Sequence, residues 1–192
     1  MIAADRTVLA LLAAGRSARF GGSKLDADLW GKPLGQHIAD TLATLPFLAR
    51  VAIAGDAELD YAALGFTVIR NPDPARGQAT SLHLAAEYAV TLGADALLIV
   101  LADMPCVTAT HVRHLLAAGD GPDAIVASTD GRAPKPPALF GRARFPALLA
   151  TGGDHGARDL IRSARTVCAS AAELVDIDQR EDLTNLALRQ GH

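Results

Sequence analysis

The sequence predicts one three-layer α/β/α domain over residues 1–192, with a mostly parallel, Rossmann-like central sheet. Two observations predict this class. Short apolar runs alternate with amphipathic segments along the chain, as they do in βαβ units. In addition, 50% of the 192 residues are hydrophobic but only 4% are aromatic, which favours helices packed closely on a sheet over an aromatic-rich β-sandwich.

Strands are expected where short apolar runs end at turn residues. The first is Thr7–Ala14, and the strongest is Asp95–Pro105, where six apolar residues precede a carboxylate and a proline. The other expected strands are residues 50–55, 66–71, 123–129, 136–142 and 173–178.

Helices are expected between these strands. One starts at Pro33, because Leu34, Ile38 and Leu42 recur every fourth residue and therefore share a face. A second runs from about Thr80 to Leu92, with Thr80 or a neighbour as the candidate N-cap. The remaining expected helices are residues 108–119, with a glycine stop, 157–164 and 179–190.

Charge and cysteine usage exclude several classes of function. The formal net charge is −3, so the chain has no general basic field that would attract nucleic acid. Cys106 and Cys168 form no CxxC pair, which argues against a zinc site or a disulfide framework. The apolar run Thr7–Ala14 is too short to cross a bilayer, and Asp5 and Arg6 interrupt any signal-like segment. We therefore expect a soluble, cytoplasmic protein.

The stretch "LAAGRSARFGGSK", Leu12 to Lys24, follows the first expected strand and contains three glycines and three cations. A glycine-rich turn between a strand and a helix exposes backbone N–H groups that suit phosphate oxygens. The P-loop spacing is absent, because Gly15 and Gly21 are one residue too far apart and Leu25 follows Lys24. The dinucleotide fingerprint G-x-G-x-x-G is absent too. We interpret the stretch as a phosphate-binding loop of another kind rather than an ordinary turn with solvated charges.

The stretch resembles the signature L-A-[AG]-G-x-S-x-R-x-G-x-x-K of the molybdenum cofactor cytidylyl- and guanylyltransferases. Five further segments resemble that family in the same order: "GKPLGQHIADTL", "NPDPARGQATSLHLAAEYA", "VLADMP", "PPALFGRARFPALLATGGDHGAR" and "DIDQREDL". The resemblance implies an Mg²⁺-dependent nucleotidyltransferase. It would join a nucleoside monophosphate from an NTP to the terminal phosphate of a molybdopterin-type acceptor and release pyrophosphate. The product would then pass to a molybdoenzyme or its chaperone.

The resemblance also implies roles for individual residues. Lys24 and Arg19 are the expected cations on the α- and β-phosphates, and Asp103 completes the catalytic set. Asp103 ends the strongest strand, where a carboxylate suits Mg²⁺. Asp178 is the expected second metal ligand, with Asp176 in reserve. The nucleotide is expected on Leu12, Ala13, Ala14, Gly15, Gly21, Gly22, Lys24, Ser81 and Asp103.

The resemblance favours CTP over GTP, because the cytidylyltransferases of the family tend to carry L-A-A-G, as residues 12–15 do here, where the guanylyltransferases carry L-A-G-G. The Ala14 methyl group would narrow the space that a purine needs, and GTP remains the alternative. On the acceptor side, the resemblance suggests Lys135, Asp154, His155 and Arg158. Two other readings stay open: a sugar- or alditol-phosphate nucleotidyltransferase, and a nucleotide-binding cofactor carrier without catalysis. Trp30 and Phe20 are expected to be packing residues, and His111 with His114 a surface pair.

Overall fold

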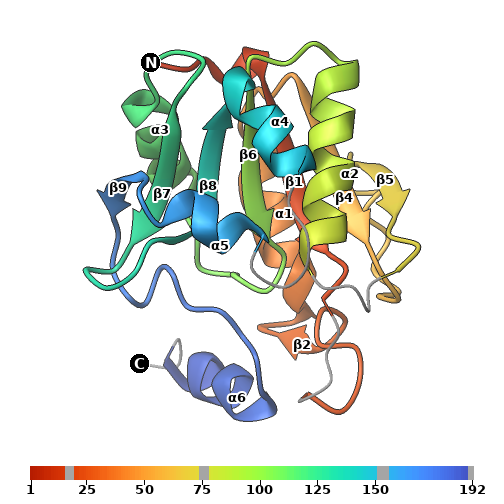
Figure 1. Cartoon of the computed structure of the whole chain (residues 1–192). Coiled ribbons are helices and arrows are strands. Elements are labelled where there is room, and N and C mark those ends of the chain that lie inside the picture. Colours follow the sequence, from red (N-terminus) through yellow and green to blue (C-terminus); the bar gives the residue numbers. More distant parts are fainter. Residues whose placement is uncertain (16–19, 74–77, 151–155, 190–192) are drawn as a thin grey trace.

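The computed structural model describes residues 1–15, 20–73, 78–150 and 156–189, and shows a three-layer α/β/α arrangement (Figure 1). A seven-stranded sheet with the order β5-β4-β1-β6-β8-β7-β9 forms the middle layer. Only β8 pairs antiparallel with its neighbours. The strands of this sheet are β1 (Thr7–Ala13), β4 (Ala49–Ala54), β5 (Thr67–Arg70), β6 (Ala96–Leu101), β7 (Ile125–Thr129), β8 (Lys135–Gly141) and β9 (Arg165–Cys168). The predicted fold class is confirmed.

Helices cover both faces of the sheet. They are α1 (Leu34–Ala43), α2 (Gln78–Thr91), α3 (Ala109–Ala118), α4 (Phe145–Leu149) and α5 (Gly156–Ile161). The last helix, α6 (Arg180–Arg189), lies beyond the edge of the sheet, and the 3₁₀ turns are η1 (Ala4–Arg6) and η3 (Arg142–Arg144) (Figure 1). The side chains of α1 and α3 share one core cluster, whereas those of α2, α4 and α5 share the other. None of the described helices has the length and apolar character that crossing a membrane would need.

Strand β1 lies inside the sheet, between β4 and β6, and is buried along its whole length. Its alternate residues face opposite layers, because successive side chains in a strand point to opposite faces. Leu9, Leu11 and Ala13 join the cluster with α1 and α3. Val8, Ala10 and Leu12 join the other cluster. Burial on both faces explains why this run carries no polar alternation in the sequence.

Three sequence expectations need correction. Residues 173–178 do not form a strand, and the last strand of the sheet is β9 instead, with a weaker apolar signal. Thr80 lies inside α2, which begins at Gln78, so it does not cap that helix. His111 is not a surface residue: it is 3% exposed, and its Nε2 lies 2.8 Å from the Ser128 hydroxyl. Burial lowers the pKa of His111, which favours the neutral ring.

A short hairpin and the last helix form a small third cluster beyond the edge of the sheet where β1 and β6 end (Figure 1). The hairpin joins β2 (Asp28–Leu29) to β3 (Lys32–Pro33) through Trp30 and Gly31, both at positive φ. Phe20, Leu29, Leu34, Ile177 and Leu186 make up the buried part of this cluster, and Trp30 packs against it. The expectation that Phe20 and Trp30 are packing residues is confirmed. The cluster brings the C-terminal segment next to the glycine-rich stretch.

Gly141→Ala is expected to lower the free energy of unfolding by about 2 kcal/mol, measured by urea unfolding. A β-carbon at Gly141 would fall on the carbonyl of Pro122, and backbone atoms cannot move aside as a flexible side chain can. Gly15→Ala is the matched control, because no atom of the described part of the chain lies within 4 Å of a β-carbon at Gly15. Equal unfolding midpoints for the two variants would contradict this prediction.

Candidate functional site

The predicted site lies where β1 and β6 end side by side. The two strands are parallel neighbours, with Leu12 opposite Leu101. Ala102 donates a backbone hydrogen bond to the Leu12 carbonyl at 3.1 Å, and this bond joins the carboxyl ends of β1 and β6. Asp103 therefore follows β6 at the same edge at which Gly15 follows β1. Ligands of parallel α/β sheets bind at this carboxyl edge.

Lys24 is the centre of the site. Its Nζ lies 2.5 Å from Asp103 Oδ2 and 3.5 Å from Asp178 Oδ1. It also donates to the Ile177 carbonyl at 2.9 Å. The residue is only 8% exposed. The structure thus brings together Lys24, Asp103 and Asp178, which the sequence separates by up to 154 positions (178 − 24 = 154).

The C-terminal segment reaches this point through its backbone. The Ile177 amide donates to the Asp103 carbonyl at 3.0 Å, and the Ile177 side chain is buried in the third cluster. Asp176 and Asp178 flank this buried residue and are both exposed. Burial of Ile177 therefore fixes the position of the two carboxylates at the edge of the site.

Asp103 is held in an environment that opposes its charge. Burial raises the pKa of this carboxyl group, and the adjacent Lys24 ammonium offsets part of that rise. Asp103 Oδ1 is buried and has no hydrogen-bond partner among the described residues. A buried carboxylate oxygen without a partner fits a hard divalent cation, which prefers oxygen ligands.

The donor set accordingly fits a metal ion bound by few protein groups. Asp103 and Asp178 would hold it, and Mg²⁺ usually completes its coordination with phosphate oxygens and water. Within the described ranges, no group of three or more His, Cys, Asp or Glu side chains is arranged to hold a metal. A metal at this edge would therefore depend on a bound nucleotide for further ligands.

Gly15 is exposed, and no atom of the described residues lies within 4 Å of the position of a β-carbon at Gly15 or Gly21. Gly21 has φ +76°, a conformation that glycine adopts without strain. Arg19, the second predicted cation, and Arg16 lie outside the described residues.

The other predicted nucleotide contacts differ in accessibility. The Leu12 and Ala13 side chains are buried, and the Ala13 carbonyl accepts a hydrogen bond from Gly55 at 3.3 Å. Ala14 is 8% exposed and is the last buried residue before Gly15. Ser81 is buried in α2, and its hydroxyl accepts a hydrogen bond from Asn71 at 3.0 Å. Ser81 is therefore part of a buried polar pair rather than an open side chain.

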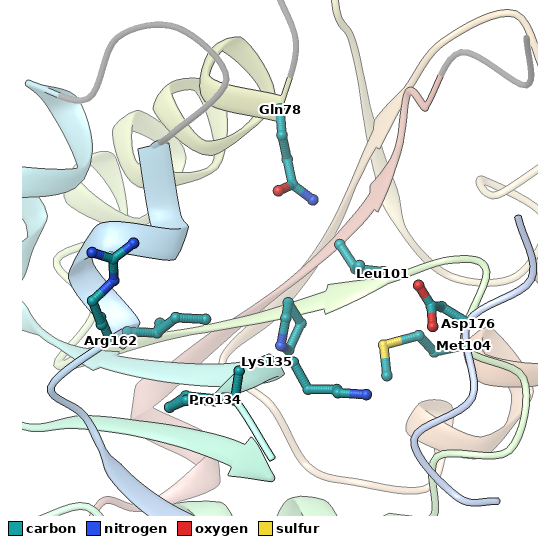
Figure 2. Close-up of a pocket in the computed structure, with 10 residues that line it drawn as sticks. Gln78, Leu101, Met104, Pro134, Lys135, Arg162 and Asp176 are labelled. Carbon is teal, nitrogen blue, oxygen red and sulfur yellow. The ribbon is translucent and has the colours of Figure 1, made fainter. Parts of the chain in front are cut away.

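A cavity of about 450 Å³ opens beside this edge of the sheet. Figure 2 places Asp176 and Met104 on one side, Arg162 on the other and Lys135 between them, with Gln78 reaching in from α2. Lys135 donates to Asp130 Oδ2 at 3.1 Å, and this contact lowers the pKa of Asp130. The cavity thus combines two cations, a carboxylate and an amide with an apolar wall.

Lys135 was predicted on the acceptor side and does line this cavity. Asp154 and His155 lie outside the described residues, as does the side chain of Arg158. Sequence reasoning missed Gln78 and Arg162. Gln78 lies in the segment "NPDPARGQATSLHLAAEYA", which resembles the family, and that resemblance could have pointed to it as a site residue. Arg162 carries no motif signal, because only the packing of α5 brings it to the cavity.

The chain is similar in sequence to known proteins. The chain is 29% identical to the purine catabolism protein PucB of Bacillus subtilis (strain 168) over 185 residues, covering 90% of this chain and 88% of that protein. It is 33% identical to a molybdenum cofactor guanylyltransferase of Cereibacter sphaeroides over 124 residues, which is 64% of this chain and 62% of that protein.

A similar fold occurs in the crystal structure of a homologue of Mycobacterium tuberculosis rv0371c from mycobacterium sp. strain JC1. That structure has a TM-score of 0.79 and 25% sequence identity, and 96% of each chain is covered. The family described as the MobA-like NTP transferase domain matches residues 9–169. This chain belongs to the MobA-like NTP transferase domain family and is a nucleotidyltransferase.

Proposed function

We propose that the chain transfers CMP from CTP to the terminal phosphate of a molybdopterin-type acceptor in an Mg²⁺-dependent reaction. The observation that carries the proposal is the Lys24 ammonium, which lies between Asp103 and Asp178 at the end of the glycine-rich stretch. In the reaction, an acceptor phosphate oxygen forms a bond to the α-phosphorus of CTP. The bond from that phosphorus to the bridging oxygen breaks, and pyrophosphate leaves with the electron pair.

This chemistry needs positioning and charge neutralisation more than it needs a base. A phosphate monoester has a second pKa near ~6, so the acceptor is already largely ionised at neutral pH. Lys24 supplies a fixed positive charge, and the backbone amides of this stretch would supply donors for the triphosphate. Asp103 and Asp178 would hold Mg²⁺, which neutralises phosphate charge when it is bound.

The preference for CTP rests on Ala14. A β-carbon at Gly55 would lie 3.0 Å from the Ala14 α-carbon, so the end of β4 packs tightly against this residue. This packing fixes the position of Ala14, so its methyl group stays at the start of the loop. GTP is the second candidate, because one relative is named as a guanylyltransferase. A single methyl group discriminates modestly between bases.

The cavity beside Asp176 supports the assignment of an acceptor site. Its two cations, Lys135 and Arg162, suit a phosphate, and its apolar wall, which includes Met104, suits a flat ring system. It borders Asp176 and thus adjoins the segment that carries Asp178. A nucleotide at the glycine-rich stretch and an acceptor in this cavity would meet near Asp103.

Pyrophosphate release with each NTP and Mg²⁺, with and without molybdopterin, tests the proposal. We expect release that requires molybdopterin and is at least about tenfold faster with CTP than with GTP. Faster turnover with GTP would overturn the choice of base. Turnover with a sugar or alditol phosphate in place of molybdopterin would overturn the acceptor. Nucleotide binding without release under any condition would favour a carrier.

A further inference from the structure

Arg180, the first residue of α6, contacts the glycine-rich stretch directly. Its Nε donates to the Phe20 carbonyl at 3.0 Å, and its guanidinium carbon lies 5.0 Å from the centre of the Phe20 ring. Phe20 is buried, so this contact joins α6 to a fixed point of the third cluster. Cation–π contacts of this geometry are attractive and favour arginine.

A second contact joins the same two segments from the other side. Lys24 Nζ donates to the Ile177 carbonyl at 2.9 Å. Phe20 and Lys24 flank the residues 21–23, which include both Gly21 and Gly22. The pair of glycines is therefore held between two hydrogen bonds to one C-terminal segment, residues 177–180.

The glycines need such support because they have no side chains of their own to hold them. Gly21 has φ +76° and Gly22 has φ +157°, and glycine reaches many other conformations without strain. The Arg180 Nη2 lies 3.9 Å from the position of a β-carbon on Gly22, so the guanidinium lies beside this residue. Without the Arg180 side chain, the backbone of Gly21 and Gly22 would lose its contact on the Phe20 side.

We infer that Arg180 is a positioning residue, which holds Gly21 and Gly22 in the conformation that binds the triphosphate. The inference rests on the proposed function, because it takes this stretch as the nucleotide site. When fewer molecules have the competent conformation, the apparent affinity for the ligand falls by the same fraction. Loss of Arg180 should therefore weaken NTP binding and leave the acceptor cavity unaffected.

The test compares Arg180→Ala with Arg189→Ala, which removes the same charge from the last turn of the same helix. Calorimetric binding of CTP and GTP, KM for molybdopterin and hydrogen exchange of the amides 20–24 are measured. We expect about tenfold weaker NTP binding and faster exchange in Arg180→Ala only. We expect the KM for molybdopterin to stay within about twofold of the wild type for both variants.

Arg180→Lys keeps a donor and a cation, so it should restore NTP affinity to within about threefold of the wild type. An Arg180→Ala variant that binds NTP as tightly as the wild type would overturn the inference, as would unchanged exchange of the amides 20–24. A wild type that binds no NTP would overturn the proposed function. In that case the exchange measurement alone decides whether Arg180 holds the glycines.

Discussion

Asp103→Asn is expected to lower kcat about 10³-fold, while the affinity for NTP changes less than about threefold. Asparagine keeps the size of the side chain but removes the charge. In the wild type, Asp103 Oδ2 accepts a hydrogen bond from Lys24, and Oδ1 is buried without a partner among the described residues. Asparagine replaces one of these two acceptor oxygens with an NH₂ group, which is a donor. Steady-state pyrophosphate release and calorimetric nucleotide binding measure the two quantities separately.

Asp95→Asn is the matched control for this variant. Asp95 directly precedes β6, at the opposite end of the strand, and its half-exposed carboxylate accepts from Arg6 Nε at 2.8 Å. Its kcat should equal that of the wild type. An Asp103→Asn enzyme that retains more than about a tenth of the wild-type kcat would remove Asp103 from the reaction and from the proposed metal site.

Lys24→Met is expected to lower kcat/KM about 10³-fold and the free energy of unfolding by about 3 kcal/mol. Activity falls because the fixed charge near the triphosphate is lost. Stability falls because the Asp103 carboxylate stays buried without the ammonium that lies 2.5 Å from it. The double variant Lys24→Met/Asp103→Asn should recover part of the lost stability, because no buried charge then lacks its partner.

Lys32→Met is the control variant, because it removes an exposed ion pair, whereas Lys24→Met removes a buried one. Lys32 lies 2.7 Å from Asp40, but both side chains are well exposed, and exposed pairs contribute less than about 1 kcal/mol. Urea unfolding of both variants provides the comparison. Equal losses of stability in Lys24→Met and Lys32→Met would show that the Lys24–Asp103 pair has no special role in the fold.

The inner strands β1 and β6 were predictable because burial on both faces leaves a continuous apolar run. Strands β1 and β6 lie within the predicted ranges, and the helix expected over residues 108–119 is present as α3, where the Thr108 hydroxyl accepts from the His111 amide at 3.1 Å. The hairpin β2–β3 and strand β9 were not predicted. Their residues are few and partly exposed, so local periodicity carries too little signal for them.

The site residues could be predicted in part, because two of them stand at recognisable points of the sequence pattern. Asp103 ends a strong strand and Lys24 closes a glycine-rich stretch, so each stands out in the sequence. Their contact does not, because it depends on which strands are neighbours in the sheet. Arg180 and Arg162 carried no such signal, since each reaches its place through helix packing.

The sequence by itself therefore determined the fold class and the residue types at the carboxyl edge of β1 and β6. Only the tertiary structure decided that Lys24 lies between Asp103 and Asp178, and that Arg180 lies on Phe20. The physical reason is how far apart in the sequence the interacting residues lie. Strand patterns and loop glycines follow from the backbone of a few adjacent residues. A contact between residues 20 and 180 exists only because Phe20, Leu29, Ile177 and Leu186 bury their apolar surfaces together.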